Sequence, residues 1–286
     1  MKSLRLRSPA KINLFLRVLG KRPDGYHEIE TVFQEIDLAD EIILRQSSGG
    51  KSLKVEGAPE IETESNLVFK ALKWLEGLSG QRFDVDIELR KNIPIAAGLG
   101  GGSSNAAALI VGMKRLFDLE WLDIEAIMPV AATVGADVPF FFFGGSAIGE
   151  GIGDRLTRIF LDQPQKILLV NPGFPVSTAG IFKEISKTLT GAMRPGILHG
   201  LYGEGHDARD FLHNDLQTVA ERLHPGISDA LDAIRRVGIN KPVMSGSGPT
   251  VFGFIENDIE EPRPGRFPKS WKTIIARSEK KGITID

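Results

Sequence analysis

Cysteine is absent from the 286 residues of the chain, and several kinds of chemistry are absent with it. Without a thiol there is no disulfide, no thiolate metal site and no cysteine nucleophile. A chain of this composition fits a reducing compartment, and we expect a cytoplasmic protein.

A strong imbalance of charge is also lacking. The formal net charge is -2 and the isoelectric point is near 6.3. This balance provides no general attraction to nucleic acid or to an anionic membrane, so we expect neither as a partner. Any anion site must be local and built from backbone amides and a few basic side chains.

Long apolar runs are missing as well. The longest, VPFFFFGG at residues 138–145, is far too short to span a bilayer. The basic N-terminus interleaves apolar and charged residues and lacks the continuous stretch of a secretory signal. Hydrophobic residues make up 42% of the chain and charged residues 25%, which is typical of a globular protein with a real core.

Alternation of apolar and polar residues predicts strands. It is clearest at 82–94, where every second residue from Phe83 to Leu89 is apolar. A hairpin is expected at 40–57, because two alternating segments flank a Ser-Ser-Gly-Gly turn. Other expected strands are 4–6, 12–16, 26–36, 166–173, two within 138–159 and two within 242–256. The expected helices are 65–80 with Ser65 as N-cap, 104–117, much of 123–134, 177–189 and two within 213–238. A loop-rich insertion is expected at 190–210.

Residues 92–110, NIPIAAGLGGGSSNAAALI, place four glycines and two serines directly before an alanine-rich apolar run. Glycine lets the backbone approach a phosphate closely and adopt positive φ. Ser103 and Ser104 add hydroxyl donors, and the helix that follows presents unpaired amides and the positive end of its dipole. The alternative is a flexible turn. Because a turn needs only one or two glycines, we predict a phosphate-binding loop.

Glycine-rich loops also occur in two other kinds of nucleotide site, the dinucleotide-binding fold and the P-loop. Gly98-x-Gly100-x-x-Ser103 nearly satisfies a dinucleotide fingerprint, with Asp118 where a ribose-binding acid is wanted. The preceding strand alternates, however, whereas the first strand of a doubly wound sheet is buried on both faces. A P-loop is excluded because no G-x-x-x-x-G-K-[ST] is present, and the protein-kinase HRD and DFG segments are absent too.

Three segments together resemble a known family. PIAAGLGGGSSNAA at 94–107 resembles the phosphate-binding motif of the GHMP kinases, the family of galactokinase, homoserine kinase and mevalonate kinase. SPAKINLFL at 8–16 and MSGSGPTVFG at 244–253 resemble its first and third motifs. The resemblance implies an α+β, two-domain GHMP kinase fold. Residues 1–160 would form an ATP-binding domain like domain 2 of ribosomal protein S5, and 161–286 a ferredoxin-like substrate domain.

One branch of the family is matched more closely. PAKINLFLRVLGKRPDGYHEIETVFQ at 9–34 and GADVPFFFFGG at 135–145 are similar to kinases of the non-mevalonate isoprenoid pathway. The resemblance implies phosphorylation of the 2-hydroxyl of 4-diphosphocytidyl-2-C-methyl-D-erythritol, with ATP as co-substrate and Mg²⁺ carried in with ATP. No carboxylate is assigned to the metal. The similarity covers most of the chain and is weakest at 185–210 and after 256.

The family match implies a catalytic pair, Lys11 and Asp137. Phosphoryl transfer asks for an oriented nucleophile and neutralised charge more than for covalent chemistry. An aspartate near the hydroxyl accepts its proton or its hydrogen bond, and a lysine beside it keeps the carboxylate ionised. Without the family match, Lys11 is an ordinary solvated side chain and Asp137 a cap for the turn before Pro139.

The resemblance also implies two sets of binding residues. In the substrate set, Tyr26 and Phe182 stack on the cytosine ring, His27 hydrogen-bonds it and Phe33 lines the methylerythritol pocket. Asn13, two residues from Lys11, shares its strand face, so we expect a polar contact with the substrate there. The set expected to bind ATP is Pro94, Ile95, Ala96, Ala97, Gly98, Leu99, Gly100, Gly101, Gly102, Ser103 and Ser104, with Asn66 near the adenine.

Two other functions remain open at this point. A GHMP kinase for another small alcohol, such as homoserine or mevalonate, would leave the Tyr26, His27 and Phe182 rings without a role. A nucleotide-binding regulator without catalysis is the second, and intact Lys11 and Asp137 argue against it.

Overall fold

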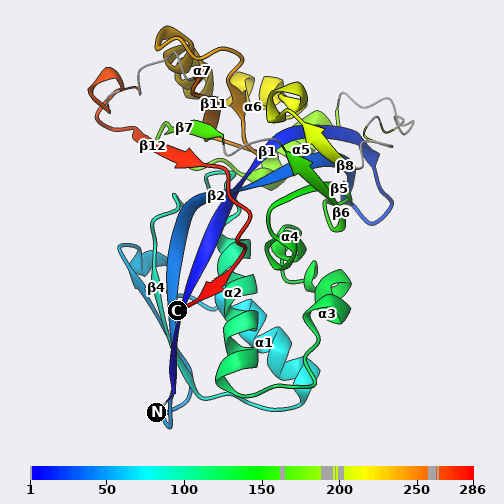
Figure 1. The fold of residues 1–286 in the computed structure, drawn as a ribbon, viewed down its shortest axis with the longest axis vertical. Helices are drawn as coiled ribbons and strands as arrows, with labels where there is room; N and C mark the ends of the chain where they lie inside the picture. Colours follow the sequence, from blue (N-terminus) through cyan, green and yellow to red (C-terminus); the bar gives the residue numbers. More distant parts are fainter. Residues whose placement is uncertain are drawn as a thin grey trace.

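The computed structural model describes residues 2–161, 165–187, 196, 198, 203–256, 262 and 264–286. Two sheets organise the chain, and helices pack against both (Figure 1). The larger sheet contains β1 (Ser3–Lys21), β2 (His27–Gln46), β3 (Ser52–Glu56), β4 (Val85–Arg90), β5 (Ser146–Gly151), β6 (Arg155–Leu161), β8 (Gly203–His206), β9 (His213–Asn214) and β13 (Thr284–Ile285). The smaller sheet has the order β10 (Val243–Met244), β11 (Val251–Phe254), β7 (Lys166–Asn171) and β12 (Lys272–Arg277).

Seven α-helices lie in the described residues. They are α1 (Leu67–Ser79), α2 (Gly101–Leu116), α3 (Ile124–Ala131), α4 (Val138–Phe143), α5 (Thr178–Ile185), α6 (Gln217–Leu223) and α7 (Gly226–Arg236). Short 3-10 turns lie at Pro59–Ile61, Ala208–Phe211 and Pro264–Arg266. The mixture of helix and strand agrees with the expected α+β class.

Strands β1 and β2 are the two longest strands and pair with each other. They pair antiparallel along almost their whole length, and Figure 1 shows them running through most of the long axis. The two short N-terminal strands expected from the alternation are thus one strand, whose register shifts at Pro9/Ala10, Asn13/Phe15 and Val18/Gly20. Strand β1 contributes side chains to three hydrophobic clusters, with Leu6 in the first, Ile12 in the second and Val18 in the third.

Helices α1 and α2 cover one face of this sheet. Leu72 and Leu75 of α1 are fully buried in one cluster with Leu44 of β2 and Leu109 of α2. Burial of such a side chain contributes roughly 1.5–3 kcal/mol. The core therefore fixes α2, and with it the loop that precedes α2.

The hairpin expected at 40–57 is wrong. Strand β4 pairs antiparallel with β2, and β3 pairs parallel with β4, so β4 lies between the two expected partners. The Ser-Ser-Gly-Gly segment reverses the chain, as predicted, but the strand that follows aligns beside a segment about thirty residues further on, which local turn chemistry does not specify.

Two further expectations about local structure are wrong. Residues 138–143 form helix α4 rather than a strand, with Pro139 in the first turn and Phe140 and Phe141 buried. A short apolar run buried on several sides has no period that separates strand from helix. The N-cap of α1 is Asn66 rather than Ser65, and the Asn66 side chain accepts from the Val68 amide at 3.0 Å.

The later part of the chain builds the second sheet and returns to the first. Helices α6 and α7 and strands β7, β10 and β11 follow the predicted order, with β10 and β11 antiparallel about the glycine-rich segment 245–249. Strands β8, β9 and β13 lie beyond residue 160 and pair with β6, β1 and β1. The division at residue 160 stays a prediction.

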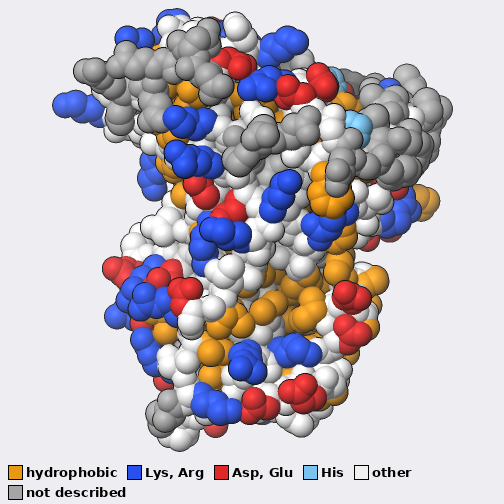
Figure 2. Space-filling view, in the orientation of Figure 1, with side chains coloured by type: hydrophobic (Ala, Val, Ile, Leu, Met, Phe, Trp, Pro, Cys, Tyr) orange, Lys and Arg blue, Asp and Glu red, His pale blue; other side chains and the backbone are white. Residues whose placement is uncertain are grey.

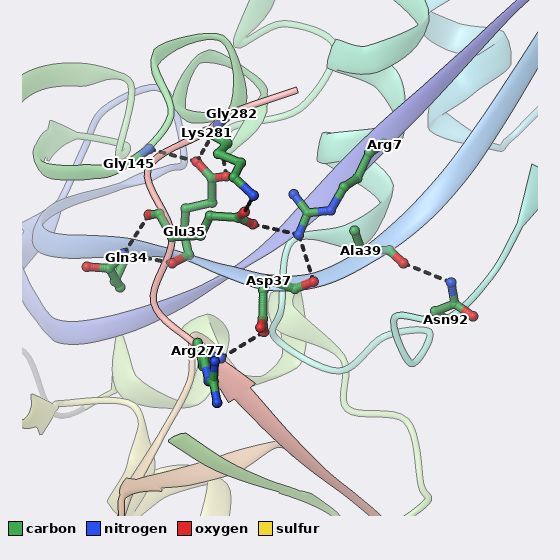
Figure 3. A network of polar contacts seen from close by, with 11 residues as sticks. Arg7, Gln34, Glu35, Asp37, Ala39, Asn92, Gly145, Arg277, Lys281 and Gly282 are labelled. Atoms are coloured by element: carbon green, nitrogen blue, oxygen red, sulfur yellow. Dashed lines mark hydrogen bonds and ion pairs between the residues drawn. The ribbon is translucent and has the colours of Figure 1, made fainter. Parts of the chain in front are cut away.

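The buried carboxylate of Glu35 holds the C-terminal segment against the larger sheet (Figure 3). Glu35 of β2 is fully buried and accepts hydrogen bonds from the amides of Gly145, at 2.7 Å, and Gly282, at 2.9 Å. Nearby, the Arg277 amide donates to Asp37 at 2.7 Å. Burial raises the pKa of Glu35, and the two amides only partly oppose that effect.

We expect the stability provided by Glu35 to fall as pH rises. A raised pKa means that the folded state holds the proton at pH values where the unfolded chain has lost it, so the free energy of unfolding decreases through that window. Urea unfolding from pH 4.5 upward should show the wild type losing stability relative to Glu35→Gln, whose side chain does not titrate. A difference that stays constant or grows with pH would contradict this.

The outer surface mixes both signs of charge (Figure 2). On the face shown, apolar side chains gather over the helical part below the middle of the molecule, with charged groups around them. No helix in the described ranges is long and apolar enough to cross a membrane. Much of the insertion expected at 190–210 lies outside the described residues.

Candidate active site

The glycine-rich loop joins β4 to α2 in a conformation that requires glycine. Gly98 and Gly100 have φ of 75° and 70°, in the left-handed region. A Cβ on Gly98 would lie 2.2 Å from the Ser245 carbonyl oxygen, and one on Gly100 would lie 2.8 Å from Cζ of Phe141. Conformation and close packing therefore both exclude larger residues at these positions.

Backbone hydrogen bonds fix the loop between the two sheets. The Lys11 amide of β1 donates to the Leu99 carbonyl at 3.0 Å, and the Thr250 amide donates to Ala97 at 3.3 Å. The Ser245 hydroxyl donates to the Gly98 carbonyl at 2.9 Å. The three segments that resemble family motifs thus meet at one place, although they are far apart in the sequence.

Helix α2 begins at Gly101, inside the glycine run and three residues before its expected start. Gly100 is its N-cap, and no side chain caps the helix. The amides of the first turn therefore remain available to an anion, and the helix dipole adds partial positive charge there.

A cavity of about 590 Å³ lies in front of this loop. Its walls include every residue from Pro94 to Ser103, together with Asn66, Lys11, Asn13, Phe33, Asp137 and Phe182. Ser104 is placed differently: it is buried beneath the loop, where its hydroxyl bonds with that of Ser8 at 2.7 Å. Most of the two predicted sets therefore share one cavity.

Lys11 and Asp137 form an ion pair in the wall of this cavity, beside the glycine loop. Lys11 Nζ lies 3.4 Å from Oδ2 of Asp137, and the lysine side chain is almost fully buried whereas Asp137 is partly exposed. The same ammonium donates to Oδ1 of Asn13 and lies 5.4 Å from the centre of the Phe33 ring. A buried lysine with these partners is held in place by the protein and is not an ordinary solvated side chain.

The amide of Asn13 is held in one orientation. The Thr31 hydroxyl donates to the Phe15 carbonyl at 2.6 Å, so it accepts from Nδ2 of Asn13 at 2.8 Å. Oδ1 of Asn13 is thereby directed to Lys11. Thr31 is buried and was not found from the sequence, because a threonine in a strand has no distinguishing pattern.

A buried polar cluster supports the loop from below, and the sequence did not predict it. Lys91 forms an ion pair and hydrogen bond with Asp40, whose other oxygen accepts from the amides of Asn92 and Ile93 at 2.8 Å. Asn105 of α2 donates to the same Asp40 carboxylate at 2.9 Å. Lys91 also lines the cavity, and its place directly after an alternating strand was the only available signal.

Of the three rings predicted to bind cytosine, Phe182 alone lines the cavity, and His27 packs against it. Phe182 belongs to α5, and the His27 ring lies 5.0 Å from the Phe182 ring, tilted by 32°. Tyr26, in the turn between β1 and β2, is 58% exposed and does not line the cavity. Burial lowers the pKa of His27, and the charge of Lys21 lowers it further, so the imidazole is neutral at pH 7.

Asn66 lies at the rim of the cavity with its side chain already bonded. Oδ1 caps helix α1, and Nδ2 donates to the Ile61 carbonyl at 3.0 Å. A contact of Asn66 with adenine therefore stays a prediction. Within the described residues, no group of three or more histidine, aspartate or glutamate side chains is arranged to hold a metal.

Known proteins match this chain along most of its length. The family profiles "GHMP kinases N terminal domain" and "GHMP kinases C terminal" match residues 66–145 and 193–282. A protein of Syntrophus aciditrophicus named 4-diphosphocytidyl-2-C-methyl-D-erythritol kinase is 43% identical over 96% of this chain and 99% of its own length. One of the same name from Geobacter metallireducens is 43% identical over 91% of this chain and 92% of its own.

A solved structure matches as well. A crystal structure of 4-(cytidine 5'-diphospho)-2C-methyl-D-erythritol kinase superimposes with a TM-score of 0.73 at 30% identity, covering 96% of this chain and 99% of that one. The homoserine kinase of Cytophaga hutchinsonii has a TM-score of 0.70 at 16% identity and so agrees in fold alone.

Proposed function

This chain belongs to the GHMP kinase family, and we propose that it transfers the γ-phosphate of ATP to the 2-hydroxyl of 4-diphosphocytidyl-2-C-methyl-D-erythritol. The observation that carries the proposal is one cavity that holds both the glycine loop and the Lys11–Asp137 pair. This is a step of the non-mevalonate route to isoprenoid precursors. We also propose a cytoplasmic location, where ATP is available.

The glycine loop is the proposed site of the triphosphate. Its backbone amides and the uncapped first turn of α2 supply donors and partial positive charge without a basic side chain in the loop. These groups are fixed before ATP arrives, because the backbone is bonded to β1 and to the segment 245–250. Preorganised donors of this kind stabilise developing charge at little reorganisation cost.

Lys11 and Asp137 are the proposed catalytic residues. Asp137 accepts the proton, or the hydrogen bond, of the attacking 2-hydroxyl, and so orients the oxygen toward phosphorus. Lys11 lies 3.4 Å from that carboxylate and neutralises charge on the phosphoryl group in transit. Asn13, held by Thr31, fixes the direction of the lysine.

We infer that Mg²⁺ enters with ATP, bound by phosphate oxygens and water. The chemistry it supplies is neutralisation of phosphate charge. Glu60 and Asp137 are carboxylates in the cavity wall, but the described residues do not form a protein cage. This arrangement suits an ion that dehydrates reluctantly.

The cytidine end distinguishes this substrate from homoserine or mevalonate. Phe182 and His27 form a tilted ring pair, with Tyr26 exposed nearby, which a small alcohol without a base would not use. The direct test is phosphate transfer from ATP to 4-diphosphocytidyl-2-C-methyl-D-erythritol by the purified chain. Transfer to homoserine or mevalonate instead, or ATP binding without transfer, would overturn the proposal.

We expect Tyr26→Ala to weaken binding of the cytidylyl substrate by roughly tenfold, since one stacking contact is worth roughly 1–3 kcal/mol. Binding of ATP should stay nearly unchanged, because Tyr26 does not line the cavity in front of the loop. The dissociation constants of both ligands, measured by calorimetry, check this. Equal losses for the two would count against stacking by Tyr26.

A further inference from the structure

The His27 side chain contacts Ser186, a residue with no role in the site described above. Nε2 of His27 lies 2.6 Å from the Ser186 hydroxyl oxygen, and that oxygen lies 2.7 Å from the Phe182 carbonyl. Ser186 follows directly after helix α5, four residues after Phe182. Residues at this spacing share a helix face. The same face of α5 therefore carries the Phe182 ring and the hydroxyl that reaches His27.

The proton arrangement at Ser186 follows from its two partners. A carbonyl oxygen only accepts, so the single hydroxyl proton is directed to Phe182, as in other serine side chains bonded one turn back in a helix. The hydroxyl oxygen is then an acceptor toward His27. Nε2 of His27 must carry a proton, and in a neutral imidazole Nδ1 is left as an acceptor.

We propose that Ser186 is a positioning residue that locks His27 in the Nε2–H tautomer and so makes the site select a 4-aminopyrimidine over a 4-oxopyrimidine. This inference rests on the proposed function, because it takes His27 as the group that meets the base. Nδ1 of His27 has no hydrogen-bond partner among the described residues, so its lone pair is available to a ligand.

The two kinds of base differ at the atom that such a lone pair would meet. Cytosine carries an exocyclic amino donor at position 4, whereas the corresponding position of a 4-oxopyrimidine is an acceptor. An acceptor opposite the Nδ1 lone pair leaves both groups unpaired, which is costly beside a buried ring. Only the opposite tautomer of His27, which carries its proton on Nδ1, would donate a hydrogen bond to the oxo group, and Ser186 opposes that tautomer.

The test compares CDP and UDP as competitors of the cytidylyl substrate. In the wild type, CDP should bind at least about tenfold more tightly than UDP. Ser186→Ala removes the acceptor, lets His27 exchange tautomers and should reduce that ratio severalfold. Ser186→Thr keeps a hydroxyl at the same position and should restore it. Circular dichroism and thermal unfolding establish that each variant is folded.

A spectroscopic readout separates this role from general support of the helix. Long-range ¹H–¹⁵N correlations of the His27 ring, assigned with His27→Gln, should show a protonated Nε2 in the wild type and a mixture in Ser186→Ala. A protonated Nδ1 in the wild type, or an unchanged CDP-to-UDP ratio in folded Ser186→Ala, would overturn the inference. Failure of phosphate transfer by the wild type would instead overturn the proposed function, and the tautomer measurement does not depend on it.

Discussion

Asp137→Asn should lower turnover by at least about 100-fold, because general base assistance typically contributes 10²–10⁴-fold. An amide cannot take the proton of the substrate hydroxyl, and it leaves the ammonium of Lys11, 3.4 Å away, without its countercharge. Binding of ATP should survive, since the triphosphate is expected to bind backbone amides of the glycine loop. Turnover and the ATP dissociation constant, measured on the same preparation, check both halves.

Asp118→Asn is the matched control for this variant. Asp118 is an exposed aspartate paired with Lys2 at the surface, so the same chemical change there should leave turnover and ATP binding intact. It is also the residue that a dinucleotide site would have used for the ribose. Near-normal turnover in Asp137→Asn would refute the assigned role. Loss of nucleotide binding in Asp118→Asn would reopen the dinucleotide interpretation.

Gly98→Ala should abolish ATP binding and lower the free energy of unfolding by more than about 3 kcal/mol. Left-handed φ accounts for about 1–2 kcal/mol of that loss. The rest comes from the new Cβ, which would lie 2.2 Å from the Ser245 carbonyl oxygen and would push the loop away from the segment that holds it. Denaturant unfolding and nucleotide titration measure the two effects.

Gly50→Ala is the control that separates the cost of backbone strain from the cost of the clash expected in Gly98→Ala. Gly50 also has positive φ, of 95°, but a Cβ there would have no atom within 4 Å. This variant should lose only the strain energy and keep full ATP affinity. If Gly98→Ala behaved like Gly50→Ala, close packing against Ser245 would not be what shapes the loop.

The glycine loop was predictable because its cause is local. A strand with strict alternation, several glycines and a helix with an apolar face follow one another within residues 82–117, and each signal is contained in its own segment. The structure differs there mainly in starting α2 at Gly101, since the first turn tolerates glycine when it is packed against Ile93 and Leu67.

Strand order was not predictable from local signals. The segments at 40–46 and 52–57 have the pattern of a hairpin, yet β4 pairs with both of them. Pairing is decided by long-range burial of side chains such as Val55 and Ile87, which share one core with α1 and α2. The Phe140–Phe143 run failed for a related reason, because burial on several sides removes the period that identifies an element.

The candidate site likewise contains residues that the sequence predicted and residues that only the structure reveals. Lys11 and Asp137 were identified through resemblance and Asn13 through the strand face that it shares with Lys11, and the structure brings the three together around one ammonium group. Thr31 and Ser186 act on other side chains rather than on a ligand, so their importance depends on contacts that no short motif encodes.

A crystal structure with a non-hydrolysable ATP analogue tests the central claim most directly. We expect the triphosphate to lie against residues 98–104, with hydrogen bonds from the backbone amides of the loop and of the first turn of α2. The terminal phosphate should face Lys11 and Asp137. A triphosphate bound elsewhere, with these amides turned away from it, would contradict the account.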